Sequence, residues 1–199
     1  MARFLRTIAA LALASLALLL SVAPAEAAGG HYVFDGGTPR EQLQVRRALD
    51  ASSFPWSVVP ARITIHIVRG IPTSEATRGE IWLDAALLDS GEFSWGVVQH
   101  EYAHQVDFFL LDDAKRAKLT PLLGGAAWWA GTSPSLAPNG TLTHAQLTSE
   151  RFASTLAWSY WQSRANSMQP RSAADESAAM APAAFRLLVS QTLDLQPAR

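Results

Sequence analysis

The pentapeptide His100-Glu101-Tyr102-Ala103-His104 has the residue types and the spacing of a metal site. An α-helix turns about 100° per residue, so two histidines four positions apart project from one face, one turn apart. Two imidazoles placed in this way can bind one Zn²⁺ at roughly 2.0–2.1 Å per bond. Glu101 lies at the edge of that face, where its carboxylate can reach a water rather than the metal. The pattern therefore predicts metal-assisted hydrolysis, and the alternative is a helix with two surface or core histidines.

The residues around this motif support a buried helix, because they are apolar and no proline interrupts them. The apolar positions are Val97, Val98, Ala103, Val106, Phe109 and Leu110. The histidines and Glu101 are the polar minority in this segment, which favours the metal site over the plain helix.

A catalytic zinc needs a third protein ligand and one open position. A third histidine shortly after the motif is excluded, because the chain reads Leu110-Leu111 there. Glu150 lies in an apolar context, and a carboxylate on a helix face that becomes buried needs a partner, which a metal can be. Asp107 is the local competitor, but it lies about 10 Å along the helix axis from His100, too far for the same cation.

These motifs resemble those of the gluzincin zinc peptidases, and within them the compact group with the anthrax lethal factor protease domain and the Mlc titration factor peptidases. Residues 100–107 match that group's pattern H-E-[FY]-[GA]-H-x-[VL]-D at every position, and residues 150–154 (E-R-F-A-S) are similar to its E-x-F-A-E. The likeness covers Gly79 to Trp161. It implies a zincin-like α+β fold, with a small mixed sheet packed beside an active-site helix and a glutamate helix. It also implies Zn²⁺ held by His100, His104 and Glu150, with Glu101 as general base.

The chain departs from that group at two points. Ser154 replaces the second acid of the E-x-F-A-E pattern, which alters one charge near the metal. No tyrosine lies between Tyr102 and Tyr160, where the group often has one that stabilises the oxyanion. His144 is the best-placed substitute and could donate a hydrogen bond to the oxyanion; the alternative is an exposed residue at a helix start. Asp107 is expected to orient His104 or a backbone group, or to serve in helix packing.

Met1–Ala27 has the features of a secretory signal peptide. Arg3 and Arg6 form a basic start, Ile8–Leu20 is apolar, and Ala25-Glu26-Ala27 is a small-x-small cleavage pattern. The apolar run is shorter than the ~20 residues that span a bilayer, so a retained anchor is the lesser alternative. We therefore expect a secreted or cell-envelope protein with no stable membrane insertion after cleavage.

The remaining residues, 28–199, are enough for one domain with one core. Without Arg3, Arg6 and Glu26 they contain 14 basic and 16 acidic residues, a net charge of −2. This near-balance gives no electrostatic reason to expect binding to nucleic acid or to an anionic membrane. The chain has no cysteine, which excludes disulfides, thiolate ligands and a cysteine nucleophile.

Residue patterns predict three strands and four further helices. The strands are His31–Asp35, which could instead be an ordered arm, Arg62–Val68 and Gly79–Asp84. The helices are Thr38–Ala51, Asp112–Leu119, Thr143–Trp161 and Pro182–Leu193. Capping boxes are predicted from Thr38 with Glu41 and from Thr143 with Gln146. The resemblance places the strand Gly79–Asp84 at a sheet edge where an extended substrate could pair with it, and an interior strand is an equal alternative. Residues 70–78 are expected to form a loop. The segment 121–125 contains a proline and two glycines and is expected to end a helix. Residues 165–181 are a candidate flexible stretch. His66 is expected to be a solvated or hydrogen-bonded strand residue, and Asp175-Glu176 a solvated face or a helix start.

The sequence thus predicts a secreted, monomeric zinc metalloendopeptidase that hydrolyses a peptide or protein substrate. Two alternatives from other classes stay open: a binding or scaffold protein with a structural zinc, and a metal-free protein with a decayed site. The seven tryptophans could line a substrate groove, although tryptophans in a small domain without disulfides are more often part of the core.

Overall fold

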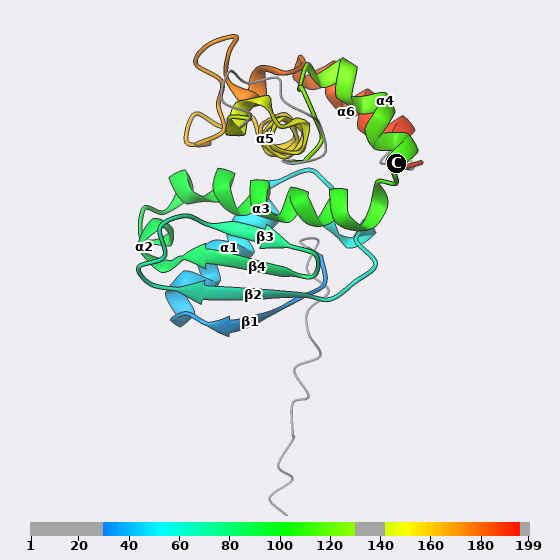
Figure 1. Ribbon diagram of the computed structural model, residues 1–199. Coiled ribbons are helices and arrows are strands. Elements are labelled where there is room, and N and C mark those ends of the chain that lie inside the picture. Colours follow the sequence, from blue (N-terminus) through cyan, green and yellow to red (C-terminus); the bar gives the residue numbers. More distant parts are fainter. Residues whose placement is uncertain (1–29, 130–141, 196–199) are drawn as a thin grey trace, which may run out of the picture.

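The computed structural model describes residues 30–129 and 142–195, so the expected signal peptide lies outside the described residues. The described residues form a mixed α/β structure with a small sheet (Figure 1). The strands are β1 (Tyr32–Gly36), β2 (Ile63–Val68), β3 (Glu75–Thr77) and β4 (Glu80–Asp84). The helices are α1 (Pro39–Ala51), α2 (Ala85–Leu88), α3 (Glu92–Leu110), α4 (Asp113–Leu123), α5 (Thr148–Tyr160) and α6 (Pro182–Thr192), with 3₁₀ turns η1 (Trp56–Val58), η2 (His144–Gln146) and η3 (Glu176–Ala178).

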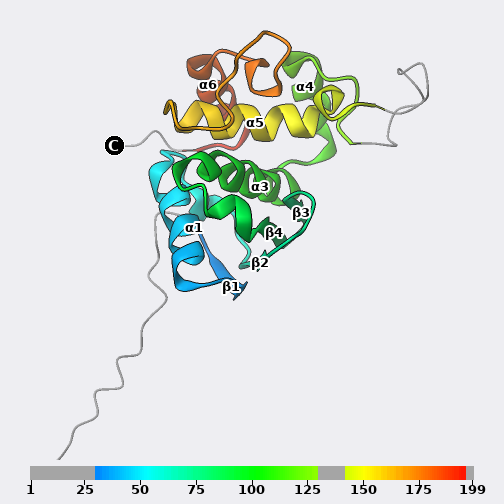
Figure 2. The ribbon, with the colours of Figure 1, turned by 90° about the vertical axis from the view of Figure 1, so that its left-hand side faces the viewer.

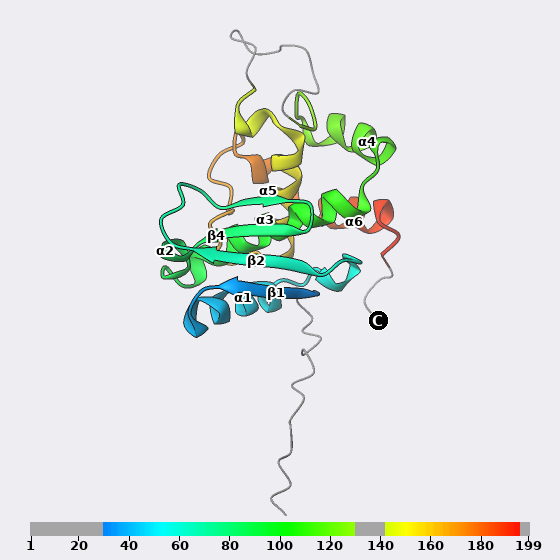
Figure 3. The same cartoon turned by 60° about the horizontal axis from the view of Figure 1, so that its bottom comes forward.

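The sheet has the strand order β1-β2-β4-β3, with all four strands labelled in Figure 1 and the sheet seen from another side in Figure 3. β1, β2 and β4 are parallel, and β3 pairs antiparallel with β4. Of the two alternatives for the strand before the metal helix, the interior position is confirmed and the edge position is wrong, because β4 lies between β2 and the edge strand β3. β3 lies within the segment expected to be a loop. Its three residues are too few for an alternating pattern to reveal.

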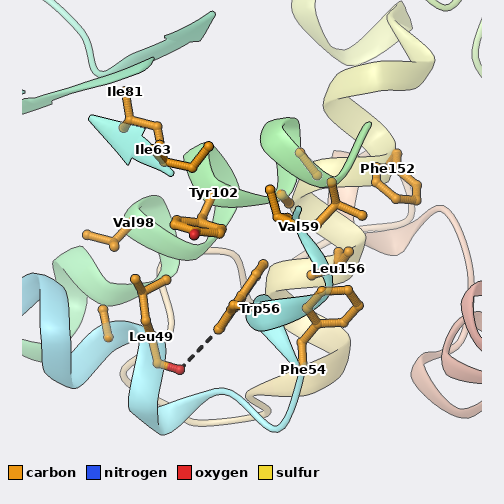
Figure 4. Close-up of a cluster of buried hydrophobic side chains, with 14 of the residues drawn as sticks. Leu49, Phe54, Trp56, Val59, Ile63, Ile81, Val98, Tyr102, Phe152 and Leu156 are labelled. Carbon is orange, nitrogen blue, oxygen red and sulfur yellow. Dashed lines mark hydrogen bonds between the residues drawn. The ribbon is translucent and has the colours of Figure 1, made fainter. Parts of the chain in front are cut away.

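The core follows from the alternation in the strands. Ile63, Ile65 and Ile67 are buried on one face of β2. His66 belongs to the other face, where its Nδ1 donates to the carboxylate of Asp35 at 2.8 Å and its ring stacks on Trp82. Aromatic side chains from the α1–β2 connection complete the core (Figure 4). Among them the buried indole of Trp56 donates to the carbonyl of Leu49 at 3.1 Å.

Helix α3 is the central layer of the molecule. It lies between the sheet and α5, with α1 alongside it, and α4 and α6 pack on α5 (Figures 1 and 2). Every residue from Val98 to Asp107 is buried. A helix enclosed on both sides has no solvent-facing stripe, which is why its polar residues must find partners inside the protein.

Gln105 is one such residue, and it fixes the β3–β4 hairpin to α3. Its amide accepts a hydrogen bond from Gly79 N at 2.8 Å and donates to the carbonyls of Thr77 at 2.8 Å and Glu80 at 3.1 Å. These three hydrogen bonds satisfy backbone groups at the turn of the hairpin. They therefore fix the position of the sheet edge relative to the metal motif on α3.

The ends of the helices confirm some predictions and correct others. Thr38 and Glu41 form the predicted capping box of α1. The capping box predicted at Thr143 closes η2 instead, and α5 begins five residues later at Thr148. Helix α4 ends within residues 121–125 as predicted, although at the glycine and not at the proline: it continues through Pro121 to Leu123 and stops where Gly124 adopts φ +71°. Glycine accepts this left-handed conformation without the steric penalty of a Cβ.

Within residues 30–129 and 142–195, no helix has both the length and the hydrophobicity that a membrane span requires.

Candidate metal centre

Three donor atoms from two helices meet at one point. His100 and His104 project from α3, and their Nε2 atoms lie 3.1 Å apart. Glu150, in the first turn of α5, places its Oε2 3.2 Å from Nε2 of His100 and 3.3 Å from Nε2 of His104. The three atoms thus form a nearly equilateral triangle at the interface of the two helices.

The size of this triangle fits a small tetrahedral cation. Zinc bonds of 2.0–2.1 Å at tetrahedral angles place neighbouring donor atoms about 3.3 Å apart. Glu101 forms a looser set with the same two histidines, in which one ligand atom from each residue lies within 4.8 Å of the others. Glu150 and the two histidines form the tighter set of donor atoms, and the carboxylate of Glu101 lies next to that set.

The carboxylate of Glu101 is buried next to the two histidines. Burial raises the pKa of this carboxyl, while the positive charge that His100 and His104 can carry lowers it, and burial has the larger effect. A buried carboxyl that favours the protonated state more than a solvated one is suited to proton transfer.

His144 lies between two carboxylates although its side chain is largely exposed. Its Nε2 lies 3.1 Å from Oε2 of Glu150, and its Nδ1 lies 2.5 Å from Oε1 of Glu176 in η3. Hydrogen bonds to Glu150 and then to Glu176 raise the pKa of His144 to about 10, against the opposing effect of its partial burial. In the absence of metal the imidazole is therefore a cation that donates to both carboxylates.

The pKa of Glu150 is lowered well below its ordinary range. Partial burial alone would raise this pKa, but the hydrogen bonds from His100, His104 and His144 outweigh it. The pKa of His100 is raised: burial would lower it, and the hydrogen bond to Glu150 with the charge of Glu101 outweighs that effect. The site thus holds an ionised carboxylate among nitrogen donors, the donor set that zinc prefers.

Ser154 connects His100 to Glu176. The Nδ1 atom of His100 lies 3.0 Å from the Ser154 hydroxyl, which donates to Oε2 of Glu176 at 2.9 Å. One turn separates Ser154 from Glu150 on α5. This helix therefore carries the candidate ligand Glu150 and also Ser154, which contacts the candidate ligand His100.

The position of Glu150 depends on a contact between α3 and the segment before α5. Trp128 donates from its indole to Oδ2 of Asp107 at 2.8 Å, and its carbonyl accepts from Ser149 N at 3.2 Å. The other oxygen of Asp107 accepts from Arg116 at 2.9 Å. Asp107 therefore serves in packing. It does not orient His104, whose buried Nδ1 has no hydrogen-bond partner in the described part of the chain.

A cavity of about 250 Å³ opens over the donor atoms. One wall is the sheet edge, residues 73–76. Another is an aromatic pair, Phe108 and Trp129, whose rings stack at 5.3 Å with an interplanar angle of 8°. The candidate ligands and Glu101 line it between these walls, so an extended molecule in the cavity would contact an exposed strand edge and an apolar surface.

Sequence reasoning identified five residues that the fold brings together: His100, Glu101, His104, His144 and Glu150. It missed the role of Glu176. This residue begins η3, which agrees with the interpretation of Asp175-Glu176 as a helix start, but its side chain is only 20% exposed and faces the site. Sequence reasoning included Trp129 only among the seven tryptophans that could line a groove, and it missed Phe108. The high aromatic content near residues 108 and 129 was a signal, but one that core packing explains equally well.

Comparison with models of known protein families, with curated proteins and with solved structures finds no match to this chain.

Proposed function

We propose that this protein is a zinc metallopeptidase of the zincin type, similar to the gluzincins. The observation that carries the proposal is the triangle of donor atoms from His100, His104 and Glu150, with the Glu101 carboxylate buried beside it. A structural pair of histidines needs neither a third donor at this spacing nor a free carboxylate at its edge.

His100, His104 and Glu150 would hold the metal, and the other residues act on the substrate. When bound, zinc supplies Lewis acidity that lowers the pKa of a water and polarises a carbonyl. Glu101 takes the proton of the attacking water and later delivers it to the leaving amine, the two steps of general base and general acid catalysis. His144 donates from its imidazolium to the oxyanion that develops on the carbonyl.

The cavity supports a peptide as the substrate. β3 pairs with β4 along one side, and its other side borders the cavity at residues 73–76. An extended peptide can add to such an edge by backbone hydrogen bonds, with its alternate side chains against Phe108 and Trp129. The substrate class is therefore proposed as an extended peptide or an unfolded protein segment, reached outside the cell if Met1–Ala27 acts as a signal peptide.

The first test is the metal content of the purified protein, measured by elemental analysis for wild type beside Glu150→Ala. About one zinc per chain in wild type, and a large loss in the variant, are expected because the third donor is removed. Zinc retained equally in both would remove Glu150 from the site, and no zinc in either would overturn the proposal. A peptide library treated with the zinc-loaded protein then tests for cleavage.

A structural zinc in a binding or scaffold protein is the second candidate, because a further nitrogen lies beside one of the three donors. Nε2 of His144 is 3.1 Å from Oε2 of Glu150. Four protein donors would close the site. X-ray absorption of the zinc-loaded protein separates the two: four protein donors favour the structural role, and three with a water favour the peptidase.

A further inference from the structure

We infer that Glu176 is a positioning residue of the metal centre: its two carboxylate oxygens hold Ser154 and His144, and through Ser154 it sets the tautomer of His100. This inference rests on the metal site of the proposed function. Its contacts, however, can be tested without any peptide being cleaved.

The tautomer of His100 follows from counting donors and acceptors. An ionised carboxylate only accepts hydrogen bonds, and a serine hydroxyl has one hydrogen to donate. The Ser154 hydroxyl donates that hydrogen to Oε2 of Glu176 at 2.9 Å, so at 3.0 Å from His100 it can only accept. The thioether of Met168, 3.6 Å from the same hydroxyl, is a weak acceptor that does not compete.

Nδ1 of His100 therefore carries a proton, which leaves Nε2 as the nitrogen of this ring that can bind a metal. Nε2 is the atom that faces His104 and Glu150, so the tautomer fixed by Ser154 and Glu176 is the one able to bind a metal. A buried imidazole with no such partner could place its proton on either nitrogen, and the proton on Nε2 would block the site.

The second oxygen of Glu176 holds His144. Oε1 lies 2.5 Å from Nδ1 of His144, which orients the ring so that Nε2 points to Glu150. One carboxylate thus restrains two imidazoles on different elements, one on α3 and one on η2. The bond to His144 is direct, and the bond to His100 passes through a hydroxyl.

The backbone around Glu176 is itself restrained, which a positioning role requires. Thr155 of α5 donates its hydroxyl to the carbonyl of Glu176 at 3.2 Å. The Asp175 side chain accepts from the backbone N–H of Arg171 at 2.5 Å and of Ser172 at 3.0 Å, which closes the preceding turn. The carboxylate is therefore presented from a turn fixed against α5.

This arrangement gives a physical account of Ser154. The resemblance to gluzincins leads one to expect an acid at this position, and the chain has a hydroxyl instead. The acidic group comes from Glu176, 22 positions later, and the small serine leaves room for it and forms the link to His100. The negative charge beside the metal centre is therefore supplied by a different part of the chain.

The test compares wild type, Glu176→Gln and Ser154→Ala by two measurements on the purified protein. The first is zinc affinity by competition with a chelator, where loss of a residue that orients a ligand lowers affinity roughly 10- to 100-fold. The second is ¹⁵N NMR of the histidine rings in the metal-free protein, which reports which nitrogen carries the proton. We expect Nδ1 of His100 to be protonated in wild type and to lose this proton, wholly or in part, in Ser154→Ala.

Glutamine at position 176 cannot replace the carboxylate, because one of its two terminal atoms becomes a donor. If its NH₂ faces Ser154, the hydroxyl must donate to His100; if it faces His144, the Nδ1–H of that ring loses its acceptor. Glu176→Asp keeps two acceptors and is expected to retain more zinc affinity than Glu176→Gln. Asp35→Asn is the matched control, because it removes a carboxylate from a 2.8 Å pair with His66 on the sheet.

An unchanged zinc affinity in both variants, or an unchanged protonation of His100 Nδ1 in Ser154→Ala, would overturn the inference. If Glu176→Gln fails to fold, Ser154→Ala decides, since it removes only one hydroxyl from α5. Zinc that binds with these effects while no peptide is cleaved would refute the peptidase and leave the role of Glu176 standing.

Discussion

The indole N–H of Trp128 donates a 2.8 Å hydrogen bond to Asp107, three residues beyond His104 on the same helix. The carbonyl of Trp128 in turn accepts from Ser149, the neighbour of Glu150. This contact connects the helix of the two histidines to the helix of the third donor. The geometry of the site therefore depends on a buried carboxylate whose two oxygens accept from Arg116 and Trp128.

Replacing Asp107 with alanine should destabilise the protein without removing a metal ligand. The variant leaves the buried indole N–H of Trp128 without an acceptor and removes one of the partners of the partly exposed Arg116. An unsatisfied buried donor costs about 1–3 kcal/mol of unfolding free energy. Urea denaturation measures the loss. Asp113→Ala is the matched control, because Asp113 is a fully exposed partner of the same arginine and should leave stability near that of wild type. If Asp107 is itself a ligand, a folded Asp107→Ala will lack zinc.

Replacing Glu101 with glutamine should abolish turnover while zinc stays bound. Glutamine keeps the shape of the side chain but cannot take a proton from water, so kcat is expected to fall by roughly 10²–10⁴-fold. Peptide cleavage and metal content are measured on the same sample. Glu92→Gln, an exposed change on the same helix, should cleave like wild type. Wild-type cleavage by the Glu101→Gln variant would show that the proposed mechanism is wrong.

Removing zinc should lower the melting temperature, because a ligand that binds only the folded state stabilises it. At free zinc about 100-fold above Kd the gain is about 2.7 kcal/mol, which raises the melting temperature by roughly 5–10 °C for a domain of this size. Differential scanning calorimetry with zinc and with a chelator measures the shift. Glu150→Gln should show almost no shift, and a shift of wild-type size in that variant would contradict its role as a ligand.

The capping box of α1 should make stability depend on pH in the acid range. The pKa of Glu41 is lowered from 4.5, first by the hydrogen bond from the backbone of Thr38, and also by Arg69 at 2.7 Å, against burial. A carboxyl with a lowered folded-state pKa binds more protons when unfolded. Its stabilising contribution is therefore fully present above pH 4.5 and is lost as the pH falls through the folded-state value.

Glu41→Gln should lose this dependence, which urea denaturation at neutral pH and at successive pH values below 4.5 would reveal. Compared with wild type, the variant should be less stable at neutral pH, and the difference should shrink with acidification. Glu92→Gln, also in the first turn of a helix but exposed, is the control and should keep the wild-type dependence. An equal loss of stability at every pH would contradict the ionic contribution of Glu41.

The sequence by itself determined the features that depend on neighbours along the chain. The four-residue spacing of His100 and His104 places them on one helix face, because helix geometry is local. The alternating isoleucines of β2 and the capping box of α1 were predictable for the same reason. Glu150 was a weaker prediction, since its buried context identified a residue in need of a partner and did not identify the partner.

Only the tertiary structure decided which distant groups meet. The bonds of Glu176 to His144 and Ser154, at sequence separations of 32 and 22, depend on how η3 packs against α5. The edge position of β3 depends on which strand pairs with β4. The contact between Asp107 and Trp128 depends on how the chain after α4 packs against α3. A periodic pattern tells which face of an element is buried, but it carries no record of the element packed against that face, so these contacts arise only when the whole chain folds.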